Sequence, residues 1–256
     1  MSNFDRCGFR VSAALLLGAM WILFSVPVLA APANPILVEL FTSEGCSDCP
    51  PADAFLKALD AAQPIPGAQL IVLEEHVDYW DDQGWRDPFS SHDLTLRQGE
   101  YVDRLHVKNG PYTPQMVVDG REAFVGSDRP QAARAFAKEA SAPKISVQIS
   151  ALHIEEGKAL AHVEIGAVSS KAEVFVAIAL DRAQSQVLRG ENGGRQLEHV
   201  AVVERLTSIG KMRKDQPFSK DVAIKMDHPE KAYRLITFVQ QMDAGKVLGT
   251  AVAHVK

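Results

Sequence analysis

Two cysteines in "SEGCSDCPPAD" (Ser43 to Asp53) lie three positions apart, immediately before two prolines. Proline is favoured in the first turn of a helix, so the pattern predicts a helix from Pro50 to about Ala62 that starts at the cysteines. Cys46 and Cys49 could be a redox couple, two metal ligands or a structural cross-link. A cross-link between residues this close removes little entropy from the unfolded chain, which favours the first two interpretations.

The first 30 residues have the composition of a secretory leader, which we predict to be a signal peptide (residues 1–30). Arg6 and Arg10 precede the apolar run "VSAALLLGAMWILFSVPVLA", and small residues precede the expected cleavage site near Ala30. The run approaches the roughly 20 residues that span a bilayer, so the alternative is an uncleaved membrane anchor. Cleavage removes Cys7 and leaves one thiol pair. We therefore predict a periplasmic or secreted protein.

Charge and composition exclude one class of partner. The formal net charge of the chain is -5 and the leader carries +1, so the remainder carries -6. Phosphate binding needs clustered Lys and Arg side chains, so this balance argues against nucleic acid as a partner. No membrane contact is expected unless the leader stays uncleaved. The chain after the leader is longer than one typical domain, which predicts two compact units.

Local signals predict the elements of residues 34–141. Short apolar runs predict strands at 36–41 and 68–77, on either side of the first helix. Ser90 or Ser91 is expected to cap a second helix, and Ser127 a third. Asp119 and Gly120 predict a hairpin turn between these two helices.

The predicted order is strand, helix, strand, helix, strand, strand, helix, with a CxxC at the first helix. This order resembles the thioredoxin fold. After residue 141 the chain changes to short alternating strands separated by polar turns, which predict an antiparallel β-sandwich-like domain over residues 142–256. We therefore predict an α/β fold, with a thioredoxin-like domain at 34–141 followed by a β-rich domain.

The position of the cysteines favours redox chemistry. A cysteine at a helix N-terminus faces unpaired N–H groups and the positive end of the helix dipole, and both favour the thiolate. Cys46 precedes the helix and is expected to be the more exposed, so we predict that Cys46 attacks and Cys49 resolves. Glu44 and Asp48 place negative charge nearby, which should raise the pKa of the thiols and argues against a strongly oxidising couple.

The thioredoxin resemblance implies further site residues. In thioredoxin-like proteins a cis proline begins the strand that faces the CxxC, and the residue before it pairs with the substrate backbone. This implies a cis Pro114 and docking by Thr113; the alternative is an ordinary trans proline at a strand start. The "ILVE" strand is similar to the "ILVD" strand of thioredoxins, which implies that Glu39 accepts a proton from the inner cysteine. Alternatively, Glu39 points to solvent or pairs with a lysine.

Five motifs in order resemble one narrower family. They are "VELFTSEGCSDCPPAD", "HVDYWDDQGWRDPFS", "YTPQMVVDG", "VGSDR" and "GENGGRQLEHVAVV". Together they are similar to the secreted bacterial family catalogued as domain of unknown function 1223, from about Ile36 to the C-terminus. The resemblance implies a thioredoxin-like fold, a secretory leader and a second β-rich domain, and it implies no defined substrate.

The second motif carries His76 and Asp78 at the end of a predicted strand, where ligands of open α/β folds gather. His76 is therefore a candidate ligand, and the alternative is a histidine satisfied by local contacts. Trp80 and Trp85 follow in the same motif. They are expected to shield the disulfide, to form a groove for a partner, or simply to cover the core.

The leading prediction is a thiol:disulfide oxidoreductase that acts on protein thiols or disulfides in the cell envelope. It needs no cofactor beyond the Cys46–Cys49 disulfide. One alternative is a protein that binds or delivers copper, a soft metal, through Cys46, Cys49 and His76, with Met116 as a further thioether ligand. Another alternative is an envelope interaction module with a vestigial redox site, which presents loops such as Arg189 to Gln196.

Overall fold

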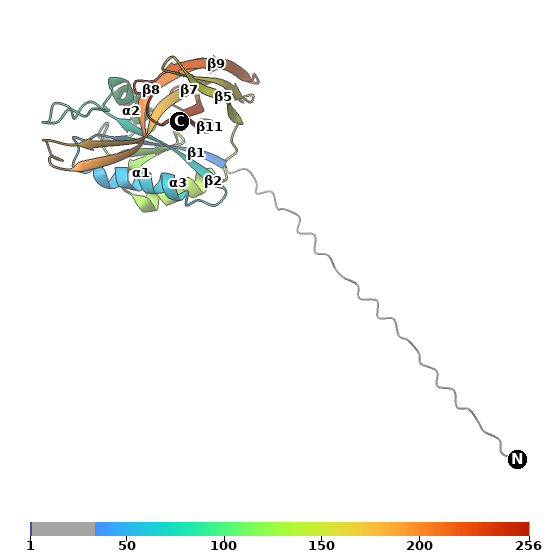
Figure 1. Cartoon of the computed structure of the whole chain (residues 1–256), viewed down its shortest axis with the longest axis horizontal. Coiled ribbons are helices and arrows are strands. Elements are labelled where there is room, and N and C mark those ends of the chain that lie inside the picture. The colour runs from blue at the N-terminus through green and yellow to red at the C-terminus, as the bar shows by residue number, and fades with distance from the viewer. Residues whose placement is uncertain (2–33, 256) are drawn as a thin grey trace. The chain divides into compact units, whose positions relative to one another are not determined.

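The computed structural model describes Met1 and residues 34–255, where three helices and two sheets form a mixed α/β fold (Figure 1). The helices are α1 (Pro50–Ala62), α2 (His92–Arg104) and α3 (Arg129–Ala140). The strands are β1 (Asn34–Thr42), β2 (Ala68–His76), β3 (Gln115–Val118), β4 (Glu122–Val125), β5 (Val147–Glu155), β6 (Lys158–Ile165), β7 (Ala172–Gln186), β8 (Gln196–Met212), β9 (Phe218–Lys225), β10 (Tyr233–Gln241) and β11 (Val247–Val255).

Two predictions concern the N-terminus and membranes. The predicted leader, with Cys7 and the cleavage site, lies outside the described residues apart from Met1. Within residues 34–255, no helix is long and apolar enough to cross a membrane.

The unit β1–α1–β2 forms as the sequence predicts. Pro50 and Pro51 occupy the first helical positions of α1 behind Cys49, which is the N-cap residue. The helix ends at Ala62, and its C-cap residue Gln63 has a left-handed φ of 45° and donates its N–H to the carbonyl of Leu59 at 3.0 Å. Because α1 crosses over between them, β1 and β2 lie parallel in the sheet.

The β3–β4 hairpin also forms as predicted. Asp119 and Gly120 have φ values of 48° and 62°, and a two-residue turn with both residues left-handed matches the twist of the flanking strands. A Cβ atom on Gly120 would lie 2.5 Å from the carbonyl oxygen of Gly245, so only glycine fits there.

The caps of the other helices are predicted in part. Ser91 is the N-cap residue of α2, as expected. The cap of α3 is Asp128 and not Ser127, since the Asp128 side chain accepts a hydrogen bond from the backbone N–H of Gln131. The prediction is one residue early because both residue types favour this position.

Helices cover both faces of β1 and β2 (Figure 1). Helices α1 and α3 lie on one face, where Leu56 and Phe136 pack with the apolar side chains of both strands. Helix α2 lies on the other face, where Tyr101 packs against Phe41. Burial of each such large apolar side chain stabilises the fold by about 2 kcal/mol.

The large sheet does not end at the predicted domain boundary near residues 141–143. Its strand order is β11-β10-β7-β8-β2-β1-β3-β4, so strands from both predicted domains share one sheet. Strand β8 pairs in parallel with β2 through Val202 and Glu74. Residues 34–255 accordingly lie within one compact unit. The residue pattern changes at residue 142 from alternating strands and helices to strands alone. The edge of β2 would nevertheless be unpaired without a partner, and β8 pairs with it, so the sheet continues past this boundary.

The small sheet has the order β5-β6-β9 and is antiparallel throughout. Its apolar side chains pack on one face of the large sheet and form a second core cluster with β7, β8, β10 and β11. In Figure 1 it lies on the side of the large sheet away from α1 and α3. Strands β7 and β8 therefore separate this core from the core beneath α1.

Candidate functional site

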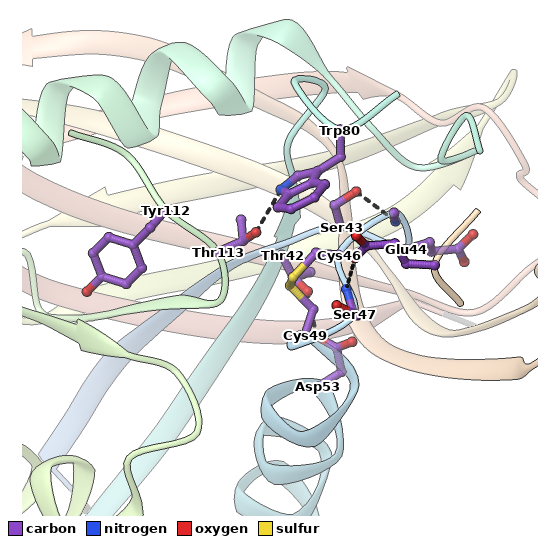
Figure 2. The surroundings of a disulfide bond; sticks show 12 residues. Thr42, Ser43, Glu44, Cys46, Ser47, Cys49, Asp53, Trp80, Tyr112 and Thr113 are labelled. Atoms are coloured by element: carbon purple, nitrogen blue, oxygen red, sulfur yellow. Dashed lines mark hydrogen bonds between the residues drawn. A yellow bond between two sulfur atoms is a disulfide. The ribbon is translucent and has the colours of Figure 1, made fainter. Parts of the chain in front are cut away.

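Cys46 and Cys49 form a disulfide at the N-terminal end of α1, with their Cα atoms 5.4 Å apart (Figure 2). The backbone turns tightly to bring them together. The N–H of Cys46 donates to the carbonyl of Ser43 at 3.2 Å, and the N–H of Cys49 donates to the carbonyl of Cys46 at 3.3 Å. Cys49 caps the helix without a side-chain hydrogen bond. The two sulfur atoms are thus held at the positive end of α1.

Both cysteines are buried, Cys46 with 1% and Cys49 with 0% of its surface exposed. We predict that Cys46 is the more exposed of the two, and the structure leaves a difference of only 1% between them. Ser47 and Asp48, which separate them, are exposed, so only the tip of the disulfide loop reaches the surface. Position at a helix start gives no information about neighbouring loops, and two such loops cover the cysteines.

Trp80, in the loop after β2, forms the first part of the cover. It packs so closely on the disulfide loop that a Cβ atom on Gly45 would lie 3.0 Å from Trp80 Cβ. Trp80 Nε1 also donates to Thr113 Oγ1 at 2.8 Å (Figure 2). The peptide bond between Thr113 and Pro114 is cis, as predicted. Trp80 therefore joins the predicted docking residue to the disulfide loop and shields both.

The connection between β7 and β8 forms the second part of the cover. Asn192 at its tip is buried and donates from Nδ2 to the carbonyls of Glu44 at 2.8 Å and Cys46 at 2.9 Å. Gly190 has a left-handed φ of 78°, and a Cβ atom there would lie 3.1 Å from Trp85 Cβ. Glycine at this position lets the two covering loops meet.

Beneath the disulfide loop lies a buried cluster of Glu74, His76 and His199, which we call the histidine cluster. His199 Nδ1 lies 2.6 Å from Glu74 Oε1, and His76 Nε2 lies 3.7 Å from the same oxygen. The two imidazole rings meet edge to face, with centroids 4.7 Å apart. Each of the three side chains is at most 1% exposed. His199 Nε2 lies 3.2 Å from Glu44 Oε1, which connects the cluster to the disulfide loop.

Opposite charges dominate the histidine cluster. Burial opposes the charged form of His76, but Asp87, 2.7 Å from His76 Nδ1, raises the pKa of His76 to about 9. Burial likewise opposes the charged form of His199, and Glu74 raises the pKa of His199 well above its ordinary value. Burial would raise the pKa of Glu74, but the two histidines lower it to about 2. The two histidines are therefore protonated and Glu74 is ionised.

Asp53 lies one helical turn after Cys49 on α1, below the disulfide (Figure 2). Its Oδ1 accepts a hydrogen bond of 2.7 Å from the hydroxyl of Thr42. Burial and then the negative charge of Glu74 raise the pKa of Asp53 to about 7. Asp53 therefore changes its protonation state near neutral pH, next to the inner cysteine.

Glu39 does not lie beside the cysteines. It is fully buried, but its carboxylate accepts hydrogen bonds of 2.7 Å from Arg97 Nε and from the Tyr101 hydroxyl, both on α2. Side chains alternate along a strand, so Glu39 faces α2 while Thr42 faces α1. The prediction that Glu39 accepts a proton from Cys49 is therefore wrong, because the "ILVE" pattern does not determine which face of the strand the acid occupies. Asp53 lies where such an acid was expected.

His76 is grouped with Glu74 and His199, and not with Cys46 or Cys49, in the part of the chain from 34 to 255. Met116, the further ligand of the copper alternative, packs in the apolar core cluster. A copper site on the two cysteines and His76 would require His76 to leave its contact with Asp87. The structure brings the cysteines together with the Thr113–Pro114 segment and keeps His76 in a separate cluster.

Several residues of this region are absent from the sequence-based predictions: Asp53, Glu74, Asp87, Asn192 and His199. Each is polar and at most 4% exposed. One signal was available, since Glu74 directly follows the apolar run 70–73, His199 directly precedes the apolar run 200–203, and buried polar groups need partners. The partners themselves come from distant segments, and His199 follows Glu74 by 125 residues.

The fold and the site together define a mixed α/β protein with a covered CxxC disulfide above a buried histidine cluster. The chain belongs to the family described as protein of unknown function DUF1223, whose model matches residues 37–240. No curated protein matches it.

Two solved structures are similar over most of the chain. Protein AGR_C_4864 from Agrobacterium tumefaciens is 25% identical with a TM-score of 0.67, and the match covers 87% of this chain and 95% of that one. HBP35 of Porphyromonas gingivalis is 11% identical with a TM-score of 0.56, and the match covers 88% of this chain and 76% of that one. At this identity the second likeness concerns the fold alone.

Proposed function

We propose that this protein is a thiol:disulfide oxidoreductase of the periplasm or the extracellular space, acting on cysteines of envelope proteins. We further propose that residues 34–141 are thioredoxin-like. Strands β2-β1-β3-β4, with β1 and β2 parallel and the others antiparallel, support this interpretation. So does the placement of α1 and α3 on one face and α2 on the other.

The observation that carries the proposal is the disulfide between residues three apart at the start of α1, next to the Thr113–Pro114 segment. A bond that closes so short a loop contributes little to stability, because it hardly restricts the unfolded chain. The helix N-terminus, in contrast, favours a thiolate once the bond is reduced. The position therefore suits exchange better than cross-linking.

In the reduced form, the Cys46 thiolate attacks a substrate disulfide, and one substrate sulfur leaves as a thiolate that takes up a proton. Cys49 then loses its proton to Asp53 and attacks Cys46, which releases the second substrate sulfur. The substrate disulfide gains two electrons and the protein dithiol loses two. With a substrate dithiol, the same steps run in reverse and the substrate is oxidised.

Exchange with a protein requires the cover to open, because both cysteines are buried. The hydrogen bonds to be broken are that of Trp80 to Thr113, the two from Asn192, that of Trp85 Nε1 to Glu44 and that of the Ser47 N–H to Glu191. Each hydrogen bond contributes about 0.5 to 1.5 kcal/mol net, so displacing the covering loops costs several kcal/mol. Local opening of this free energy occurs in folded proteins without global unfolding. A docking substrate would replace Trp80 at Thr113.

The test uses the mature chain with its disulfide intact. Mass mapping should find the Cys46–Cys49 bond, and dithiothreitol should open it. The wild type should reduce insulin or oxidise a reduced peptide, the Cys46→Ser variant should do neither, and the Cys49→Ser variant should accumulate a mixed disulfide on Cys46. A wild type that is inactive in both directions with model and envelope proteins refutes the enzymatic proposal.

A second candidate is favoured by one observation, the complete burial of both cysteines. On that interpretation the chain is an envelope interaction module and its disulfide takes no part in chemistry. The Cys46→Ser/Cys49→Ser double variant separates the two candidates. It should restore function to a deletion strain if the chain is a module, and fail to do so if the disulfide exchanges.

A further inference from the structure

We propose that Glu74, His76 and His199 bind a divalent transition metal, with zinc as the ion that best suits the donor set. Two imidazole nitrogens and one carboxylate oxygen are ligands that Zn²⁺, Co²⁺ and Ni²⁺ accept, whereas Mg²⁺ and Ca²⁺ prefer oxygen alone. The inference is independent of the proposed function, since none of the three residues takes part in disulfide exchange.

The first observation is that three ligand atoms converge. One carboxylate oxygen of Glu74, one nitrogen of His76 and one nitrogen of His199 all lie within 4.8 Å of one another, and all three residues are buried. Glu74 Oε1 is 3.7 Å from His76 Nε2 and 2.6 Å from His199 Nδ1. Ligands about 2.1 Å from a tetrahedral zinc lie roughly 3.4 Å apart, between these two distances.

The second observation is an unpartnered nitrogen. His76 Nε2 is buried and has no hydrogen-bond partner, although it points toward the Glu74 carboxylate. A buried polar atom without a partner destabilises the fold by about 1 to 3 kcal/mol, so such an atom calls for an explanation. A bound ion would give this nitrogen its partner.

The third observation is that the outer atoms of all three side chains are already held. His76 Nδ1 faces Asp87 at 2.7 Å, and His199 Nε2 faces Glu44 Oε1 at 3.2 Å. The other oxygen of Glu74 accepts a hydrogen bond of 2.7 Å from the N–H of Val200. Metal-bound histidines commonly have such carboxylate partners, which fix the ring and its tautomer. The inner atoms remain directed at one another.

The charge balance agrees with a cation. Within residues 34–255, every ion pair of Glu44, Glu74 and Asp87 involves His76 or His199. The three carboxylates therefore surround two side chains that are neutral when they bind a metal. An ion of charge +2 would replace the protons that the histidines otherwise hold. It would take the place of the proton between Glu74 and His199 and widen that contact.

The experiment uses the mature chain with its disulfide intact, stripped with a chelator and then titrated with Zn²⁺ or Co²⁺. We expect one ion per chain, visible cobalt bands typical of nitrogen and oxygen ligation, and a higher melting temperature with Zn²⁺. The His76→Ala variant should lose the cobalt bands, and Asp87→Asn should bind about 10 to 100 times more weakly, because Asp87 orients His76. His162→Ala, which removes a half-buried histidine paired with Asp221 and outside the cluster, is the matched control and should bind as the wild type does.

Circular dichroism shows whether each variant is folded, and the wild-type titration stands even if a variant is not. The proposal is wrong if the wild type takes up no stoichiometric ion, or if His162→Ala weakens binding as much as His76→Ala does. The Cys46→Ser/Cys49→Ser variant should bind Co²⁺ as tightly as the wild type. Loss of binding in that variant would instead assign the ligands to the cysteines and overturn the site proposed here.

Discussion

Glu74 and Glu75 are neighbours in β2, but they belong to two different buried clusters, because side chains alternate across a strand. Glu74 belongs to the histidine cluster, on the side of the sheet that α1 covers. Glu75 faces a second group under α2, the arginine cluster, formed with Glu39, Arg97 and Tyr101. Both clusters bury carboxylates completely, so they differ mainly in the source of the positive charge.

The arginine cluster carries a permanent cation. Arg97 pairs with Glu39, lies 3.7 Å from Glu75 and stacks over aromatic rings, including that of Phe238 at 5.1 Å. An arginine does not lose its proton, so this charge is fixed. The positive charge of the histidine cluster is carried by protons on His76 and His199, which the proposed metal ion would replace. The comparison suggests that the first cluster serves the fold and the second can respond to ligands.

The largest expected effect comes from removing the fixed cation. In Arg97→Met the Glu39 carboxylate stays buried without its partner, which should lower the free energy of unfolding by about 3 to 5 kcal/mol. Urea unfolding of the intact chain measures it. The exposed pair of Lys138 and Glu122 is the control, and Lys138→Met should change stability by no more than about 1 kcal/mol.

A smaller loss for Arg97→Met than for Lys138→Met would contradict the role of the arginine cluster. A second variant guards against simple misfolding. Arg97→Met combined with Glu39→Met removes both charges and should recover part of the lost stability.

The next effect is a pH dependence of the free energy of unfolding, which arises from Asp53 on the α1 side of the sheet. Asp53 faces Glu74, His76 and His199, and its pKa in the folded protein is about 7 against 3.8 for the free side chain. Because the folded-state pKa is raised, the stabilisation is complete below about pH 4 and is lost as the pH rises through about 7. The metal-free wild type should therefore lose up to about 1.4 kcal/mol per pH unit in this window from Asp53 alone.

Asp53→Asn cannot ionise and should lack this part of the slope in urea unfolding measured across the window. Asp48→Asn, a change of the same chemistry at an exposed position in the disulfide loop, is the control and should keep it. Identical slopes for the wild type and Asp53→Asn would show that Asp53 is already ionised at low pH.

These clusters mark where prediction from the sequence succeeds and where it fails. The start of α1 and the turn at Asp119 and Gly120 were predicted because proline, aspartate and glycine act on their own local backbone. The buried clusters were not, because which face a residue occupies depends on register. Glu39 illustrates this, since a strand of apolar residues buried on both sides gives no alternation from which to read the face.

The covering loops and the extent of the sheet were missed for a related reason. Asn192 reaches the carbonyl of Cys46 from 146 residues away, and no local signal records that contact. In the same way, β8 extends the sheet beyond β2, although strand-rich sequence after residue 142 predicted a separate domain. Contacts between distant segments decide both features.

A third prediction concerns the loops that cover the disulfide at the start of α1 and limit access to it. Asn192→Ala removes two hydrogen bonds that hold the cover on the disulfide loop. Because each contributes about 0.5 to 1.5 kcal/mol, the rate of reduction by dilute dithiothreitol should rise about tenfold or more. Gln186→Ala, which removes an exposed hydrogen bond to Arg195 in the same hairpin, is the control and should leave the rate unchanged. Equal rates for all three proteins would mean that the cover does not limit access.

The smallest effect tests how much the hydrogen bond from Thr42 changes the pKa of Asp53. The hydroxyl of Thr42 donates to the Asp53 carboxylate and thereby favours its ionised form. Thr42→Val keeps the shape but removes this donor, so the pKa of Asp53 should rise further, by less than about one unit. The midpoint of the Asp53-dependent slope should move to higher pH by the same amount. A midpoint that falls would mean that burial and Glu74 do not control this carboxyl, because the loss of a donor to the charged form can shift its pKa only upward.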